Sequence, residues 1–133
     1  MILVDSSVWV AYFNGHVSAE TDYLDSILGT EPVAIGDLIL TEVLQGFRKD
    51  ADYRAARNLL TGLAVRELLG TPMAIKSADN YRMLRQRGIT IRKTTDVIIA
   101  TYCIEHSLSL LYADKDFDPF VKWLKLRPAL RRL

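Results

Sequence analysis

The chain has 133 residues, of which 50% are hydrophobic, so it can bury a core and is not expected to be disordered. Its 17 basic and 16 acidic side chains give a formal net charge of +1, and overall charge therefore gives no argument for nucleic-acid binding. The single cysteine, Cys103, excludes an intramolecular disulfide and fits a reducing cytoplasm. We expect no signal peptide and no membrane span, because no apolar run approaches about 20 residues.

The first nine residues, MILVDSSVW, predict a buried strand that is followed directly by a helix. An uninterrupted apolar run over residues 2–4 stops at Asp5, as is typical of strands in a parallel sheet. Asp5 then lies at the carboxyl end of the strand, where open α/β sheets bind ligands. Ser6 or Ser7 is placed to cap the helix. The alternative interpretation of Asp5 is a helix cap with no chemical role.

A second helix is expected from Ser18 to the stop at Gly29, followed by a short strand over residues 33–35. The segment 37–48 predicts a third helix, because its apolar residues recur at helical spacing on one face. Glu42 lies at the margin of that face, where its carboxylate can point into a cleft. The alternative for Glu42 is an ordinary solvated glutamate.

Basic residues gather where this third helix ends and the next one, predicted over 50–63, begins. The candidates for binding a phosphate backbone are Arg48, Lys49, Arg54 and Arg57, and the alternative is a solvated face. An extended segment follows over 64–69, and a helix over 72–87 begins with proline in its first turn. A short extended link is expected over residues 89–91.

The segment RKTTDVIIATYCIEH predicts the central helix of the protein. Thr94 and Thr95 are favourable cap residues, and Asp96 falls in the first turn, where the helix dipole favours a negative charge. Residues 97–104 are apolar nearly all round, so the helix is expected to be buried. Asp96 is therefore either a complement to the dipole or a functional carboxylate at the top of a buried helix.

The last apolar strand, predicted over residues 108–112, leads into the sequence ADKDFDP. Asp114 thus repeats the arrangement of the opening segment, with an acid at the carboxyl end of a buried strand. The alternating acids here lack the glycine and the terminal glutamate of an EF-hand, so a calcium loop is not expected. The basic tail KLRPALRRL is compatible with one more edge strand and a flexible end.

Helices alternate with short buried strands throughout, without a repeat or an interdomain linker. This alternation predicts an α/β fold in which a mostly parallel central sheet is flanked by helices, as one domain over residues 1–133. The carboxyl ends of two strands and the starts or margins of two helices can then converge on one sheet edge. The four acidic side chains at these positions are Asp5, Glu42, Asp96 and Asp114.

Four carboxylates brought together without a counter-ion would repel one another, and a divalent cation removes that repulsion. An all-oxygen set without a His or Cys cluster favours Mg²⁺, or Mn²⁺, over zinc. Carboxylate-held Mg²⁺ commonly serves the hydrolysis of phosphodiesters, since the metal activates water and neutralises the developing charge on the phosphate. The residues therefore predict a magnesium-type site at the sheet edge with basic patches nearby.

Four motifs, VDSSVW, LTEVLQG, TTDVIIATYC and LLYADKDFD, occur in this order along essentially the whole chain. In this arrangement the sequence resembles PIN-domain ribonucleases, specifically the VapC-type toxins of toxin–antitoxin pairs. Asp5, Glu42, Asp96 and Asp114 match the acidic quartet of that family, and Asp116 matches a variable fifth acid. The small hydroxyl residues beside the acids match Ser6 or Ser7 and Thr94 or Thr95.

The resemblance implies a PIN-like fold and a Mg²⁺-dependent cytoplasmic endoribonuclease that cleaves RNA as the toxin of a toxin–antitoxin pair. It also implies a homodimer and a neutralising VapB-type antitoxin that lays a C-terminal peptide across the active site. Arg92 and Lys93, directly before the helix that carries Asp96, join Arg48 and Lys49 as candidate RNA contacts. Which RNA is cut, and whether one or two ions bind, is not determined by the residues.

Other functional classes fit the sequence less well. A non-catalytic or regulatory binding module on the same fold would not need all four acids. A receiver-type signalling domain would place adjacent acids after the first strand, but Ser6 follows Asp5. A phosphohydrolase with an aspartate nucleophile would carry a second acid where Ser7 stands.

Overall fold

The computed structural model describes residues 1–131, so the last two residues of the basic tail lie outside the described part. Within that part, five parallel strands form one sheet in the order β3-β2-β1-β4-β5, which confirms the α/β prediction. The strands are β1 (Ile2–Val4), β2 (Val33–Gly36), β3 (Ala64–Arg66), β4 (Ser109–Leu111) and β5 (Arg127–Pro128). Among residues 1–131, no helix is long and apolar enough to cross a membrane.

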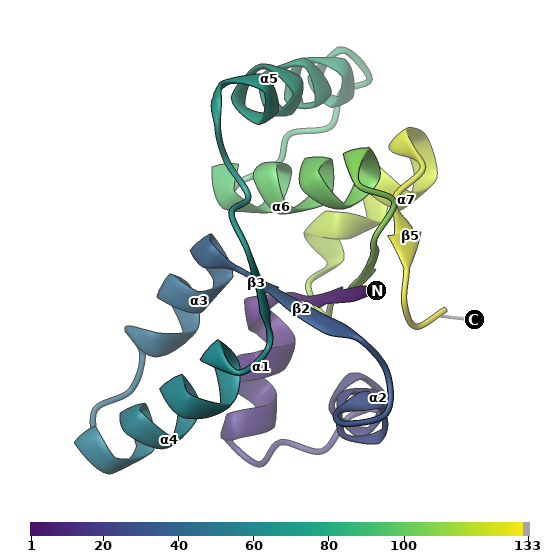
Figure 1. Cartoon of the computed structure of the whole chain (residues 1–133). Coiled ribbons are helices and arrows are strands. Elements are labelled where there is room, and N and C mark those ends of the chain that lie inside the picture. Colours follow the sequence, from purple (N-terminus) through teal and green to yellow (C-terminus); the bar gives the residue numbers. More distant parts are fainter. Residues whose placement is uncertain (132–133) are drawn as a thin grey trace.

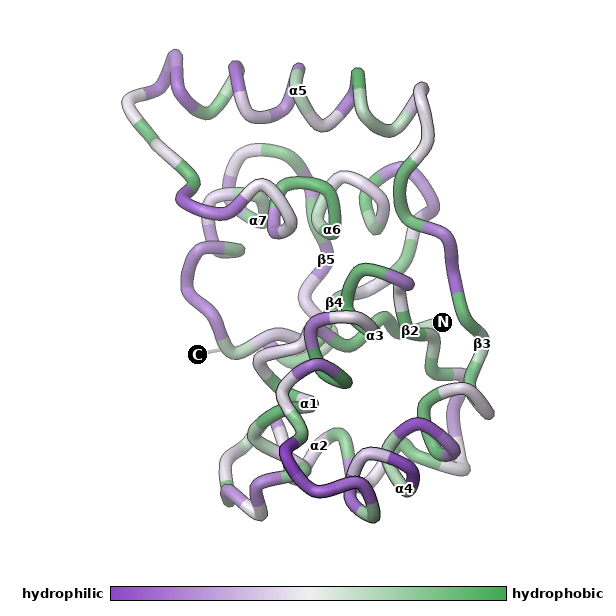
Figure 2. The backbone as a smooth tube through the Cα atoms, turned by 90° about the vertical axis from the view of Figure 1, so that its left-hand side faces the viewer, coloured by the Kyte–Doolittle hydropathy of each residue, from purple (hydrophilic) through white to green (hydrophobic). Residues whose placement is uncertain are grey.

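Helices cover both faces of the sheet. The α-helices are α1 (Ser6–Phe13), α2 (Ala19–Ile27), α3 (Asp37–Leu44), α4 (Asp50–Thr61), α5 (Thr71–Gln86), α6 (Thr94–Glu105) and α7 (Asp118–Leu124), and a 3₁₀ turn, η1, spans Lys115–Phe117. α1, α2, α3 and α4 pack together below the sheet in Figure 1, whereas α5, α6 and α7 pack above it. Figure 2 shows the same layers from the side, with α6 between α5 and the sheet.

The N-terminal strand lies in the middle of the sheet, because β1 pairs with β2 on one side and β4 on the other. Leu3 is opposite Ala34 in β2 and Leu110 in β4, and all three are fully buried. Both faces of a parallel sheet are covered by helices, which is why these short strands are mostly apolar. The carboxyl ends of β1, β2 and β4 consequently open onto one common edge.

The core forms where the sequence pattern places it. Val97, Ile98 and Ile99 of α6 are all buried, so this helix is the central one, as predicted. Trp9 is fully buried and stacks against Phe13 at a ring separation of 5.9 Å. Cys103 is also fully buried, and burial raises the pKa of its thiol to about 12, which makes it a core residue without nucleophilic character.

Three local predictions differ from the structure at helix ends. Asp5 itself caps α1, since the helix begins one residue after the strand and leaves no room for a serine cap. Lys93 is the N-cap of α6 without a side-chain cap bond, because Thr94 is already helical. The third helix ends at Leu44 rather than residue 48, just before Gly46. The predicted edge strand in the tail is present as β5.

Candidate functional site at the carboxyl edge of the sheet

The four predicted acids come from four different elements that meet at the carboxyl edge. Asp5 follows β1, and Asp114 follows β4 by three residues. Glu42 lies on α3, which starts directly after β2, and Asp96 lies in the first turn of α6. Asp5 and Asp96 are buried, at 3% and 5% exposure, whereas Glu42 and Asp114 are half-buried. The edge therefore combines buried and accessible carboxylates.

Ser7 fixes the orientation of Asp5. The Asp5 Oδ2 atom accepts hydrogen bonds from the Ser7 backbone N–H at 3.1 Å and from the Ser7 hydroxyl at 2.6 Å. The same hydroxyl oxygen accepts a bond from the Ala113 N–H, 3.3 Å away in the loop after β4. Ser7 thus connects the two strand ends that carry Asp5 and Asp114. Ser6 has a different partner, since its hydroxyl donates to Glu42 Oε1 at 3.4 Å.

A tight group of three carboxylates lies next to these residues. One oxygen each of Asp96, Asp114 and Asp116 fall within 4.8 Å of one another, close enough to share a metal ion. Asp114 caps η1 by accepting the Asp116 N–H at 2.9 Å, which brings the two aspartates of the loop together. The loop and the start of α6 therefore build this group from segments that are about 20 residues apart in sequence.

Burial and mutual repulsion raise the pKa values of the inner acids. Burial raises the pKa of Asp96 to about 7, with repulsion from Asp5 and Asp114 adding to the shift. Burial also raises the pKa of Glu42, and the charge of Asp5 contributes. The pKa of Asp5 is raised by burial, although its hydrogen bonds from Ser7 oppose the shift. These carboxylates hold protons more tightly than ordinary acids because burial and mutual repulsion outweigh the attraction of Lys93.

Within residues 1–131, two buried carboxylate oxygens have no hydrogen-bond partner, Asp5 Oδ1 and Asp96 Oδ2. An unpaired buried carboxylate oxygen is unfavourable unless a donor or a cation satisfies it. Oxygen ligands without a nearby His or Cys suit a hard cation such as Mg²⁺ or Mn²⁺. The chemistry of the site therefore fits a divalent metal.

Arg92 and Lys93 lie at the rim of the acidic group. Arg92 Nη2 is 3.3 Å from Asp116 Oδ2, and Lys93 Nζ is 3.8 Å from Asp114 Oδ2. Both basic side chains are well exposed, at 78% and 60%, so they can move to another anion at little energetic cost. These pairings were not predicted from the sequence. The signal for them is the basic pair immediately before an acid-bearing helix.

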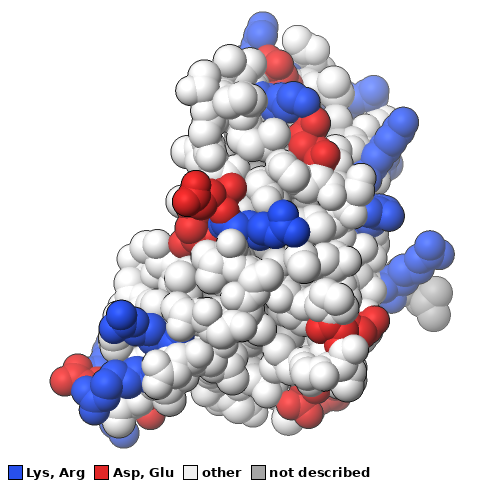
Figure 3. Space-filling model, viewed as in Figure 1, with Lys and Arg blue, Asp and Glu red and all other residues white. Residues whose placement is uncertain are grey.

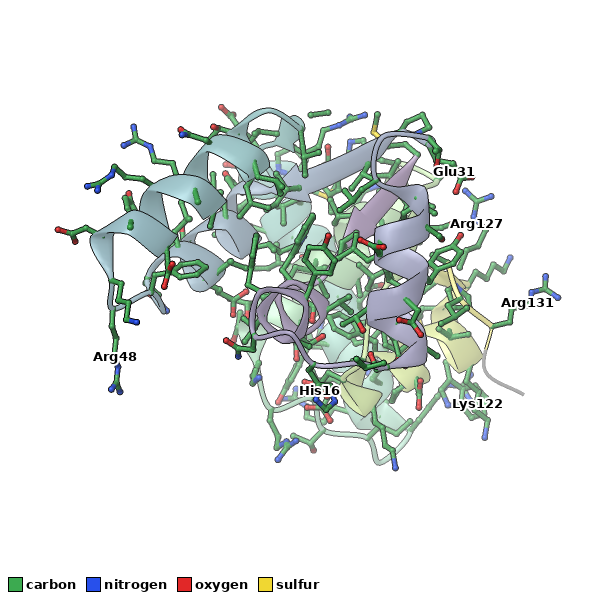
Figure 4. All side chains as sticks on the ribbon, turned by 90° about the horizontal axis from the view of Figure 1, so that it is seen from below. His16, Glu31, Arg48, Lys122, Arg127 and Arg131 are labelled. Carbon is green, nitrogen blue, oxygen red and sulfur yellow. The ribbon has the colours of Figure 1, made fainter. Side chains whose placement is uncertain are left out.

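The other predicted contacts lie elsewhere. Arg48 and Lys49 are exposed in the α3–α4 connection and line a pocket of about 500 Å³ with Phe13 and Phe47. Figure 4 shows Arg48 pointing away from the body of the protein on that side. Thr94 is exposed at the start of α6 and makes none of the side-chain hydrogen bonds found in residues 1–131. The structure therefore brings the acids and serines together but leaves Arg48 and Lys49 apart.

The sequence profile of the PIN domain matches residues 2–121. The chain belongs to the PIN-domain family. Within this family it is 30% identical over 131 residues to a protein named Ribonuclease VapC11 from Mycobacterium tuberculosis, covering 97% of this chain and 98% of the relative. A protein of Mycobacterium bovis named VapC ribonuclease Mb1587 has the same identity and coverage.

Solved structures of other proteins share the fold of this chain. VapBC2 from Rickettsia felis, bound to a DNA fragment from its promoter, superposes with a TM-score of 0.75 at 19% identity. That similarity covers 96% of this chain and 97% of the other chain. VapBC-1 from nontypeable Haemophilus influenzae gives a TM-score of 0.72 at 16% identity, covering 96% of each chain. At these identities the structural similarity establishes the fold of the PIN domain alone.

Proposed function

We propose that this VapC-type PIN domain is a metal-dependent endoribonuclease and the toxin of a toxin–antitoxin pair. The observation that carries the proposal is the group formed by Asp96, Asp114 and Asp116, whose oxygens lie within 4.8 Å of one another. The names of its relatives support the same activity. A non-catalytic module would gain nothing from burying an aspartate with an unpartnered oxygen at the sheet edge.

In this proposal the site residues hold one cation, or two, and present RNA to it. The ligands are Asp5, Glu42, Asp96, Asp114 and Asp116, with Mg²⁺ preferred and Mn²⁺ as a substitute. When bound, the metal activates a water molecule and neutralises the charge that develops on the phosphate. Ser7 keeps Asp5 oriented, and Ser6 does the same for Glu42. The carboxylate of Asp96 would be deprotonated when it holds the cation, since its pKa of about 7 is near neutral and a bound positive charge favours the charged form.

The nature of the cleavage products tests this chemistry. We expect RNA cleavage in Mg²⁺ or Mn²⁺ that stops in EDTA and leaves 5′-phosphate and 3′-hydroxyl ends, because a water molecule attacks the phosphorus. A mechanism through the RNA 2′-hydroxyl needs an acid and a base, commonly two histidines. His16 and His106 do not approach the acids, since His16 follows α1 and His106 follows α6 at its far end. End-labelling that finds 2′,3′-cyclic phosphates, or full cleavage in EDTA, would contradict the proposal.

We propose that Arg92 and Lys93 hold the phosphates beside the cleaved bond. With a cation held by Asp114 and Asp116, both basic side chains would be free to contact RNA. Changing both to glutamine in an inactive Asp96→Asn background should weaken RNA binding and flatten its dependence on log[salt] by about 1.4, or 0.7 for each lost contact. Titrations at several salt concentrations measure this slope. Lys76→Gln on α5 is the control and should leave the slope unchanged, because the Lys76 ammonium already pairs with Glu105.

Arg48 and Lys49 are the second pair of proposed RNA contacts, at the far side of α3. The same titration on Arg48→Gln with Lys49→Gln decides their role separately. A reduced slope supports a long RNA path across the molecule. An unchanged slope would mean that Arg48 and Lys49 are solvated surface residues that do not contact RNA.

The proposed partners are a VapB-type antitoxin and a second copy of the chain. The antitoxin is supported by the solved VapBC complexes that share this fold. A second copy is supported by an apolar pocket of about 440 Å³ between α5 and α6, beside the exposed side chains of Leu69 and Ile75. Light scattering should give twice the monomer mass, and Ile75→Glu should reduce it. A wild-type monomer at high micromolar concentration would contradict the homodimer.

A further inference from the structure

Charge is distributed unevenly over the fold, although the chain as a whole is almost neutral. The first 47 residues contain seven acidic side chains and neither lysine nor arginine, whereas residues 82–131 contain ten lysines and arginines. In Figure 3, basic side chains follow the right-hand border of the molecule, over α5, α7 and the segment after it. A second group of basic side chains lies at the lower left of Figure 3. Cations gathered along one border of the molecule are a typical footprint for a phosphate backbone.

An exposed tryptophan lies within this basic region. Trp123 on α7 is 39% exposed, whereas the other tryptophan, Trp9, is fully buried. The guanidinium of Arg87, at the end of α5, lies 4.1 Å from the centre of the Trp123 ring, and Lys122 Nζ lies 5.1 Å from it. Among residues 1–131, neither Arg87 nor Lys122 forms an ion pair with a carboxylate. The aromatic ring is thus accessible and flanked by uncompensated positive charge.

This surface is directly connected to the acidic site along two segments. Contacts hold the loop between α5 and α6 at both ends. The Arg87 guanidinium lies over the Trp123 ring at one end, and Arg92 forms an ion pair with Asp116 at the other. Trp123 also lies five residues after Asp118, the first residue of α7, which corresponds to about 8 Å along the helix axis. In Figure 4, Lys122 and Arg131 extend outward on the same side of the protein. An RNA strand that leaves the acids along α7 would therefore reach Trp123 next.

We propose that Trp123, Arg87 and Lys122 form a stacking platform for an unpaired base of the RNA that flanks the cleaved bond. An unstacked base can extend the stack of the indole and the guanidinium plane, while Lys122 binds the adjoining phosphate. RNA is favoured over an acidic protein segment because an aromatic ring bearing cations serves both the base and the backbone of a nucleotide. The platform rests on the proposed function, and it sets where the substrate must be single-stranded.

Binding of short RNA in EDTA tests the platform without cleavage. The probes are a fluorescent oligoadenylate and an abasic ribose-phosphate oligomer of the same length. Trp123→Leu should raise the Kd for oligoadenylate by about tenfold, and Trp123→Phe should retain most of the affinity because its ring still stacks. The abasic oligomer should be insensitive to Trp123→Leu but bind more weakly to a variant with Arg87→Gln and Lys122→Gln. Oligoadenylate should also quench tryptophan emission, which reports on Trp123 since Trp9 is buried.

Lys76→Gln on α5 is the control for loss of one exposed cation, and it should leave both affinities unchanged because the Lys76 ammonium already pairs with Glu105. Equal oligoadenylate affinity for the wild type and Trp123→Leu would overturn the platform. An equal loss of affinity of Trp123→Leu for the abasic oligomer would also overturn it. So would a change in the molecular mass of this variant, measured by light scattering, that is large enough to explain the loss. Mg²⁺-dependent cleavage of cellular RNA by the wild type is measured in parallel. If the wild type cleaves while Trp123→Leu binds normally, the platform fails and the proposed function stands.

Discussion

Asp96→Asn should reduce RNA cleavage in Mg²⁺ by about 10³-fold, a loss of roughly 4 kcal/mol in transition-state stabilisation. The same change should stabilise the metal-free protein. Carboxylate oxygens within 4.8 Å repel by about 3 kcal/mol at an effective dielectric constant near 20, and an amide of equal shape removes that repulsion. We expect the melting temperature in EDTA at pH 8 to rise by about 5 °C. Cleavage in Mg²⁺ and thermal unfolding in EDTA measure the two effects.

Asp118→Asn is the matched control, because Asp118 also lies in the first turn of a helix but outside the acidic group. Its carboxylate accepts the Tyr112 hydroxyl at 2.8 Å, a bond that an amide oxygen can replace. This variant should cleave RNA at the native rate and melt at or slightly below the native temperature. If Asp96 only complements the helix dipole, Asp96→Asn should behave in the same way, with activity retained and stability slightly reduced. That result would remove Asp96 from the proposed site.

The stability of the metal-free protein should fall as the pH rises through the acid range. Asp96 has a pKa of about 7 in the folded state against an ordinary value of 3.8, so the folded state binds more protons between these values. The unfolding free energy in EDTA should therefore be about 2 kcal/mol lower at pH 8 than at pH 5.5. Mg²⁺ should reverse this trend, since it binds the deprotonated carboxylates and stabilises the protein most at pH 8.

Urea unfolding at several pH values, with EDTA or with Mg²⁺, measures this dependence. Asp96→Asn should flatten the pH dependence in EDTA, because the titrating carboxyl is gone. Asp118→Asn should keep the wild-type dependence. Stability in EDTA that rises from pH 5.5 to pH 8 would contradict the uncompensated acidic site, and so would Mg²⁺ that stabilises equally at both pH values.

Local sequence patterns were sufficient to predict the fold class and the order of its elements. The uninterrupted apolar run over Ile2–Val4 indicates a strand that is buried on both faces. Residues 97–104 are apolar nearly all round, which indicates a buried helix. The helix ends were less predictable. Thr94 is a favourable cap by residue type, but the chain enters α6 one residue earlier and the backbone of Lys93 takes that position. Which residue caps a helix depends on the position of the helix start to within one residue, and hydrophobic periodicity does not define the start that closely.

The sequence by itself determined that Asp5 and Asp114 follow buried parallel strands, and hence that they share one edge of the sheet. Only the tertiary structure decided that Asp96 and Asp116 join Asp114 in a group within 4.8 Å, and that Arg92 approaches Asp116 while Arg87 lies over Trp123. The physical reason is the range of the interactions. Strand and helix patterns record burial over a few neighbouring residues, whereas these contacts depend on how loops and helices pack across the whole chain.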